Sequence, residues 1–212
     1  MEQNFKATFE NSFKWENLEF FLKEIPLAIK QSEIGIRRVS KIIKAMKDIA
    51  HPGVKEKTYT DINNSIEVSI TIPKNEWKYL ADLELDLDPD LPPLLCLQEE
   101  INQVLLNTIV NAANAIEQRN GLNSPEKGNI IIKSCRENND ILIKISDTGT
   151  AIKKEFNKKI FDPFYKTKPV GKGTGQGLSI VQNIIVEKHN GLIEVETKLN
   201  EETTFIYKLP LS

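Results

Sequence analysis

The sequence GKGTGQG at residues 171–177 places glycine at every second position over seven residues. Ordering glycine in regular structure costs roughly 0.5–1 kcal/mol relative to alanine, so this stretch is a poor helix or strand interior. An apolar helical pattern begins directly after it, at Leu178. The stretch therefore constrains the chain to form a loop that leads into a helix. A flexible linker, a mobile lid and a surface that a ligand approaches closely are the competing interpretations.

The residues around the glycines favour a phosphate site over a linker. Backbone N–H groups at the start of a helix, with no Cβ atoms in the way, bind phosphate oxygens well. Lys166 and Lys168 lie just upstream. The common phosphate motifs do not fit, because GxxxxGK[ST] is absent and Gln176 and Leu178 stand where GxGxxG needs its third glycine.

Composition excludes several classes of protein. The 212 residues are long enough for one domain and a smaller piece. A net charge of −2 and a pI near 5.9 give no electrostatic reason to expect a nucleic acid as partner. No apolar run approaches the roughly 18 residues of a membrane span, so we expect no membrane segment in this chain. Cys96 and Cys135 form no CxxC pair, and a reducing cytoplasm is the simplest localisation.

The N-terminal part of the chain carries a heptad pattern. Ten positions are spaced alternately four and three residues apart, and nine are apolar: Leu18, Leu22, Ile25, Ile29, Ser32, Ile36, Val39, Ile43, Met46 and Ala50. This pattern predicts a long bundle or coiled-coil helix with a kink or a late start at Pro26. A partner helix is favoured to cover the apolar seam, and packing of the seam on the rest of the domain is the alternative. His51-Pro52-Gly53 ends it. Residues 1–57 and 58–212 are therefore expected to be separate domains.

Residues 58–212 alternate between helical and strand patterns without a regular βαβ order. Helices are expected at 61–81, capped by Asp61, at 98–118 and at 177–191. Strands are expected at 83–88, 129–135, 141–146, 192–197 and 203–209. These elements predict an α+β fold in which a mostly antiparallel or mixed sheet is covered by helices on one face.

The predicted helix at 98–118 has an unusual polar face. Its core face is apolar, and a second stripe consists of amides alone: Gln103, Asn107, Asn111, Asn114 and Gln118. An ordinary solvated face would carry Lys and Glu, which favour helix more than Asn does. A bland hydrophilic face remains an alternative. A row of amide oxygens and donors that faces a polar ligand or a hard cation such as Mg²⁺ is favoured.

Asp147 follows a predicted strand directly and precedes Gly149 in SDTGTAI. This segment fits an ordinary turn, and it fits equally well an acceptor for an exocyclic amine in a pocket.

Four motifs in order, NTIVNAANAI, DTGTAI, FDPFYKTK and GKGTGQGLSIV, resemble the N, G1, F and G2 boxes of sensor histidine kinases. The resemblance covers roughly residue 58 to the C-terminus. It implies the Bergerat-type two-layer α/β sandwich that gyrase, MutL-type ATPases and a heat-shock chaperone share. The helix at 18–50 resembles the second helix of the dimerisation and histidine-phosphotransfer hairpin, which implies a homodimer.

The resemblance implies ATP and Mg²⁺ as cofactors and gives roles to single residues. Asn111 would coordinate Mg²⁺ through its side-chain oxygen, and Asn107 and Asn114 would assist at the phosphates and the metal. Asp147 would accept a hydrogen bond from the adenine amine, and Gly149 would let the backbone approach the base. The other positions carried over are Phe161 and Leu178 beside the nucleotide, Lys168 at a phosphate, and Gly171, Gly173, Gly175 and Gly177 in a lid that frames the triphosphate.

Two features bear on the reaction. Members of the gyrase branch have a glutamate at the position that matches Asn107, and this glutamate activates water as a general base. The amide of Asn107 cannot act as a general base. The resemblance therefore implies transfer of the γ-phosphoryl to a histidine, and from there to an aspartate of a response regulator. The acceptor, a His followed by Glu or Asp within a helix, is missing, because His51 and His189 both lie at helix ends. We expect the acceptor on a hairpin helix outside this chain.

The chain departs from the family pattern at three positions. Ala151 replaces the second glycine of the G1 box, Glu202 replaces the glycine before the last strand, and Asn114 stands where many members have Lys, His or Gln. The first departure predicts a tighter fit near adenine and a lower affinity. Two alternative functions stay open: a gyrase- or MutL-class ATPase, and a nucleotide-binding or anti-sigma-like interaction module without kinase activity.

Overall fold

The chain divides into two compact units, Met1–Lys55 and Glu56–Ser212. The computed structural model describes residues 20–29, 31–32, 35–36, 56–121, 124–157, 159–165, 175–198 and 201–211. In the first unit residues 20–29 are helical across Pro26, so this helix does not start after the proline. The described seam residues Leu22, Ile25, Ile29 and Ile36 are exposed. The rest of the seam after Ile36, and His51, lie outside the described residues.

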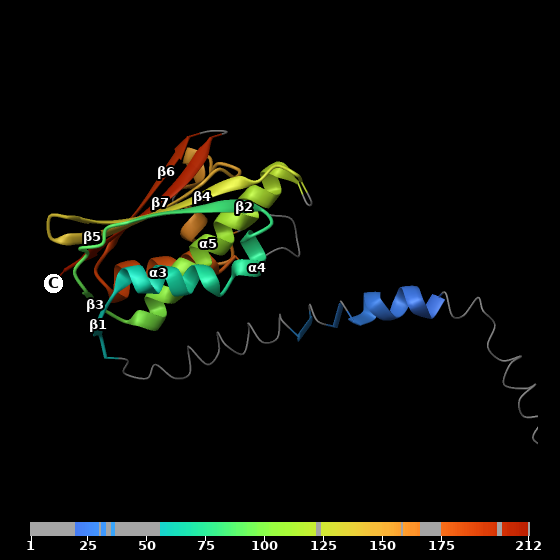
Figure 1. The fold of residues 1–212 in the computed structure, drawn as a ribbon, viewed down its shortest axis with the longest axis horizontal. Coiled ribbons are helices and arrows are strands. Elements are labelled where there is room, and N and C mark those ends of the chain that lie inside the picture. Colours follow the sequence, from blue (N-terminus) through green and yellow to red (C-terminus); the bar gives the residue numbers. More distant parts are fainter. Residues whose placement is uncertain are drawn as a thin grey trace, which may run out of the picture. The chain divides into compact units, whose positions relative to one another are not determined.

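The second unit is built on a five-stranded mixed sheet (Figure 1). Its strand order is β2-β4-β5-β7-β6, and only β2 and β4 are parallel neighbours. The strands are β2 (Ala81–Leu87), β4 (Gly128–Glu137), β5 (Asp140–Asp147), β6 (Leu192–Lys198) and β7 (Glu202–Pro210). A separate short pair consists of β1 (Thr58–Thr60) and β3 (Leu94–Cys96), which the sequence did not predict.

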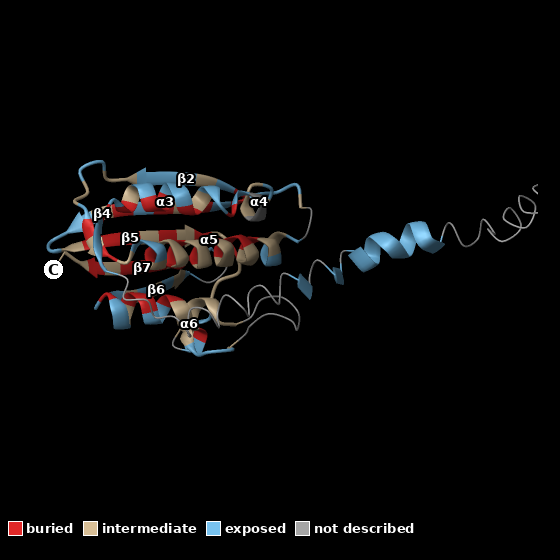
Figure 2. Ribbon diagram, turned by 90° about the horizontal axis from the view of Figure 1, so that it is seen from below, coloured by how far each residue is buried: buried red, intermediate tan, exposed pale blue. Residues whose placement is uncertain are grey.

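The described helices of the second unit pack on one face of this sheet (Figures 1 and 2). They are α3 (Ile62–Thr71), α4 (Lys74–Trp77), α5 (Gln98–Asn120) and α6 (Gly177–Gln182), which continues as the π-helical segment η3 (Asn183–Lys188). Two 3₁₀ turns, η1 (Lys154–Phe156) and η2 (Lys159–Phe161), follow β5. The arrangement confirms the predicted two-layer α+β sandwich with helices on one face.

The long helix α5 lies at the centre of the core. It contacts α3 on one side and α6 on the other, and it packs on β4 and β5. Figure 2 shows its buried positions between its exposed and half-buried ones. All six predicted core residues of this helix are buried: Ile101, Val104, Leu105, Ile109, Ala112 and Ile116. Burial of this apolar face fixes how the amide stripe of the same helix is presented.

The prediction of one helix over residues 61–81 is wrong in its second half. Asp61 caps the helix as expected, because its carboxylate accepts the Asn64 backbone N–H at 3.1 Å. The helix α3 ends before Pro73, which has no N–H to donate and fixes its own φ angle. A short turn of helix follows, and β2 begins at Ala81, two residues before the predicted strand.

The predicted helix at 177–191 is present but ends earlier and changes type. Its first six residues are α-helical, and residues 183–188 form wider π-helical turns that end before His189. Gly191 follows in a position that only glycine fits, because a Cβ there would lie 2.5 Å from the Lys208 carbonyl oxygen on β7. This close approach ends the helical segment against the sheet.

Candidate functional site

The buried face of β5 ends in a carboxylate. Ile141, Ile143 and Ile145 point into the core with the two-residue period of a strand, and Asp147 occupies the next position on that face. Asp147 is only 4% exposed, and one of its oxygens accepts the Gly149 N–H at 2.9 Å. Burial raises its pKa from 3.8 to about 7, and the Gly149 bond partly opposes this rise. The fold thus keeps a costly buried acid at the end of the sheet.

Thr203 on β7 lies directly opposite Asp147 in the strand register. It is 2% exposed, and its hydroxyl oxygen is buried without a hydrogen-bond partner in the described part of the chain. The sequence reasoning missed this residue. Its signal was the strand period, because Phe205, Tyr207 and Leu209 occupy the same buried face two, four and six residues later. A buried hydroxyl without a partner is costly unless a ligand supplies one.

Asp147 and Thr203 line a pocket of about 270 Å³. Helix α5 forms one wall, the loop after β5 another, and the start of α6 a third. The lining is mainly apolar away from the polar pair, and it includes Ala112, Ala115, Ile152, Phe156, Leu178 and Phe205. A concave apolar pocket with a few buried polar groups at one end suits a flat heterocycle that carries a polar edge.

The amide stripe of α5 leads from this pocket toward the start of α6. Asn111 lines the pocket and is half-buried. Asn107 lies one turn earlier, and its side-chain N–H donates to the Gly177 carbonyl at 3.4 Å. Asn114 behaves differently, because its side chain donates back to the Val110 carbonyl of its own helix at 2.6 Å. The structure therefore brings Asn107, Asn111 and Gly177 together and turns the donor group of Asn114 toward the helix backbone.

The other residues singled out from the sequence fall into four groups. Gly149 closely approaches α5, because a Cβ there would lie 2.4 Å from the Ala115 carbonyl carbon. Phe161 is half-buried at the end of η2, and Gly175 adopts a positive φ of 71°. Leu178 lines the pocket directly. Lys168, Gly171 and Gly173 lie outside the described residues.

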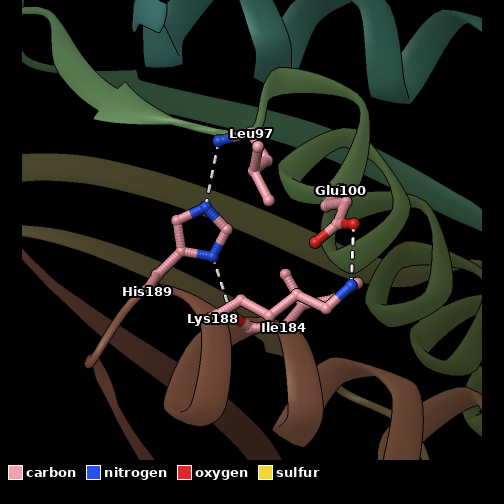
Figure 3. Close-up of polar contacts among 5 residues, drawn as sticks. All are labelled: Leu97, Glu100, Ile184, Lys188 and His189. Carbon is pink, nitrogen blue, oxygen red and sulfur yellow. Dashed lines mark hydrogen bonds and ion pairs between the residues drawn. The ribbon is translucent and has the colours of Figure 1, made fainter. Parts of the chain in front are cut away.

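His189 is buried at the end of η3, beside the start of α5 (Figure 3). Its Nε2 atom accepts the Leu97 backbone N–H at 3.0 Å, and its Nδ1 atom lies 2.7 Å from the Ile184 carbonyl oxygen. This pattern requires a neutral ring that carries its proton on Nδ1. Beside it the Lys188 ammonium pairs with Glu100 at 2.8 Å. Both ring nitrogens are thus occupied in joining η3 to the start of α5.

Acidification should weaken the fold through His189. Burial lowers its pKa below the ordinary 6.5, so the unfolded state binds a proton at a higher pH than the folded state does. The stabilising contribution of the neutral ring is complete above pH 6.5, the ordinary pKa. It is lost as the pH falls from there through the lower pKa of the folded state. We expect His189→Ala to lower the free energy of unfolding by about 2–4 kcal/mol at about pH 8, and by less at about pH 5.5. Urea titrations of both proteins at both pH values measure this, and an equal loss at both would contradict the role of the neutral ring.

Comparison with known proteins identifies relatives of this domain. Residues 96–212 match the family model described as histidine kinase-, DNA gyrase B-, and HSP90-like ATPase. The signal transduction histidine-protein kinase AtoS of Escherichia coli is 31% identical over 179 residues, which cover 84% of this chain and 28% of AtoS. A putative sensor protein of Shewanella frigidimarina is 28% identical over 88% of this chain and 27% of its own length. The chain thus spans less than a third of these curated relatives.

Solved structures give the same relationship. The catalytic domain of the histidine kinase ThkA superposes with a TM-score of 0.62 at 31% identity, covering 73% of this chain and 97% of that domain. A structure of ThkA in complex with the response regulator protein TrrA superposes with a TM-score of 0.66 at 26% identity. That match covers 84% of this chain and 48% of the solved one. Among the described helices of this chain, none is both long and apolar enough to span a bilayer.

Proposed function

The chain belongs to the histidine kinase-, DNA gyrase B- and HSP90-like ATPase family, and from this premise we propose that it is the catalytic part of a sensor histidine kinase. In this proposal it binds Mg-ATP and transfers the γ-phosphoryl group to a histidine on a hairpin helix outside this chain. The observation that carries the proposal is the continuous site formed by Asp147 and Thr203 at the buried end of the pocket and by Asn111 and Asn107 toward α6.

Adenine fits the buried end of this pocket. The Asp147 carboxylate accepts a hydrogen bond from the adenine amine. The Thr203 hydroxyl, which has no partner within the described residues, supplies a second polar contact at the same edge of the base. The apolar lining, including Leu178, covers the faces of the ring. A guanine presents a carbonyl oxygen where adenine has its amine, and that oxygen would face the carboxylate. ATP is therefore bound in preference to GTP.

The phosphates and the magnesium ion belong at the amide end of the site. The Asn111 side chain makes no hydrogen bond within the described residues, so its oxygen is free to serve as a ligand of the kind that Mg²⁺ prefers. Asn107 assists from one turn away, and Asn114 does so through the carbonyl of its amide. Gly175 and Gly177 contribute backbone N–H groups near the start of α6. The family resemblance also assigns Lys168, Gly171 and Gly173, which lie outside the described residues, to the phosphates. Bound magnesium would neutralise phosphate charge while these groups orient the chain of phosphates.

Transfer to a protein acceptor follows from the residue at position 107. Its amide does not take a proton, so the site offers no general base for water where a gyrase-type ATPase has its glutamate. An ATPase that turns over without an acceptor is the disfavoured alternative. His189 is a poor acceptor because both ring nitrogens are engaged in the folded domain. We therefore place the acceptor on another segment of the full protein or on a separate chain.

The proposed partners follow from the same scheme. The exposed apolar seam of residues 22–36 suits a second copy of this helix and a first hairpin helix, which makes the chain a homodimer. A response regulator receives the phosphoryl group from the histidine, and ThkA was solved in complex with such a regulator. The cytoplasm, which supplies ATP, is the proposed location of this domain.

An Asp147→Asn variant tests the adenine contact directly. We expect the parent to bind Mg-ATP more tightly than Mg-GTP, because only adenine donates a hydrogen bond to the carboxylate. The variant replaces one acceptor oxygen by an N–H₂ group, so it should bind ATP at least about tenfold more weakly. Calorimetric titration of both proteins with both nucleotides measures this. Equal binding of ATP by parent and variant would refute the adenine site.

The same variant should be more stable than the parent without nucleotide. Because the folded pKa of Asp147 is raised to about 7 from 3.8, its contribution to stability falls as the pH rises through that interval. The neutral amide can still accept the Gly149 N–H and avoids the buried charge. We expect Asp147→Asn to raise the free energy of unfolding at about pH 8 by up to about 4 kcal/mol. Urea unfolding of both proteins checks this, and a destabilised variant would show that the carboxylate serves the fold instead.

A further inference from the structure

Arg119 joins two strand ends beside the pocket. It lies in the last turn of α5. Its Nη1 atom donates to the Thr148 carbonyl at 2.8 Å and to the Glu201 carbonyl at 3.2 Å. Thr148 is the residue after β5, and Glu201 is the residue before β7. One guanidinium nitrogen therefore binds the backbone just after β5 and the backbone just before β7.

These carbonyls flank the polar pair of the pocket. The register of β5 and β7 ends with Asp147 opposite Thr203. The ladder of backbone bonds between the two strands therefore ends at this pair, and beyond it the ladder no longer fixes the distance between Asp147 and Thr203. Arg119 adds its two bonds one residue beyond Asp147 and two residues before Thr203. Arg119 thus links the two strands just beyond the last residue pair of the ladder, as a clamp would.

The surrounding contacts fix the β5 side of this clamp independently. The Thr148 backbone N–H donates to the Asn129 carbonyl at 3.1 Å, and the Thr148 hydroxyl accepts the Asn129 N–H at 2.8 Å. The Thr150 N–H donates to the Ala115 carbonyl of α5 at 3.1 Å. With Thr148 held in this way, the bond from Arg119 to Glu201 locates the start of β7, and with it Thr203, relative to α5.

We propose that Arg119 is a positioning residue for adenine recognition: it sets the spacing at which the Asp147 carboxylate and the Thr203 hydroxyl both meet the amino edge of the base. The inference rests on the proposed nucleotide function. It assigns to Arg119 no contact with the ligand. The effect is one of geometry, because the pKa of Asp147 is governed by its burial and by the Gly149 bond. A lysine carries its donors on one nitrogen at the end of a shorter side chain, so it can replace these two bonds only in part.

The test compares ATP with purine riboside triphosphate, which lacks the 6-amino group. Arg119→Met and Arg119→Lys variants of the full chain are titrated with each nucleotide in the presence of magnesium. We expect Arg119→Met to weaken ATP binding by about fivefold to tenfold and binding of the amine-free nucleotide by less than about twofold. Arg119→Lys should fall between the parent and Arg119→Met. A role confined to stability would lower both affinities in the same proportion.

Arg136→Met is the matched control. Arg136 is also exposed and also donates to a backbone carbonyl, that of Asn138 at 3.1 Å, but it lies at the opposite end of β5 from Asp147. Both affinities should stay at parent values in this variant. If Arg119→Met weakens the two nucleotides equally, or neither, the positioning role is overturned. If the parent itself binds the two nucleotides equally, the Asp147 contact of the proposed function fails instead, so the two failures are distinguishable.

Discussion

Replacing Asn111 with alanine is expected to abolish magnesium-dependent ATP binding, with a loss of roughly 100-fold or more in affinity. Asn111 lines the pocket on α5, and its side chain makes no hydrogen bond within the described residues. Its amide oxygen is thus the group that the proposed metal site would lose. Asn111→Asp should fail as well, because a carboxylate adds negative charge beside the triphosphate.

The fold of the Asn111→Ala variant should stay intact. The truncated side chain leaves no buried partner unsatisfied, and alanine favours helix more than asparagine does. We expect unchanged circular dichroism and a free energy of unfolding within about 1 kcal/mol of the parent. Gln103→Ala is the matched control, because Gln103 belongs to the same stripe of the same helix and does not line the pocket. Calorimetry that shows Asn111→Ala binding Mg-ATP like this control would contradict the metal role.

Periodic patterns made most of the domain predictable. Alternation of apolar residues placed β4, β5, β6 and β7, and the apolar face of α5 was identified residue by residue. These elements bury one face each, so their hydrophobic period survives in the sequence. The buried position of Asp147 follows from the same period, because it continues the row of Ile141, Ile143 and Ile145.

Features that depend on tertiary contacts were not predictable in this way. The strands β1 and β3 have three residues each, too few to show a period. The division of residues 61–81 has a local cause, Pro73, which the prediction of a single helix overlooked, and a tertiary one, the pairing of β2 with β4, which the local pattern does not contain. Thr203 has the right strand phase, but its importance appears only when Asp147 is placed opposite it. The side-chain direction of Asn114 is a rotamer choice that a helical stripe leaves open.

The central claim concerns the destination of the phosphoryl group. The chain alone should bind ATP and gain no phosphohistidine, since His189 is buried with both ring nitrogens engaged and His51 lacks an acidic neighbour. A hairpin that carries a His-Glu pair should restore phosphoryl transfer when it is supplied as a separate chain. The exposed seam at residues 22–36 offers the surface on which such a hairpin would dock.

The most direct measurement incubates the chain with ATP that is radiolabelled on its γ-phosphorus, with and without the supplied hairpin. Phosphohistidine is lost in acid and survives alkali, so the bond can be identified from its stability. We predict an acid-labile label on the hairpin, no label when the hairpin histidine is replaced by alanine, and none on the chain by itself. Label on the isolated chain that His51→Ala or His189→Ala removes would contradict the account, and so would ATP turnover that needs no hairpin.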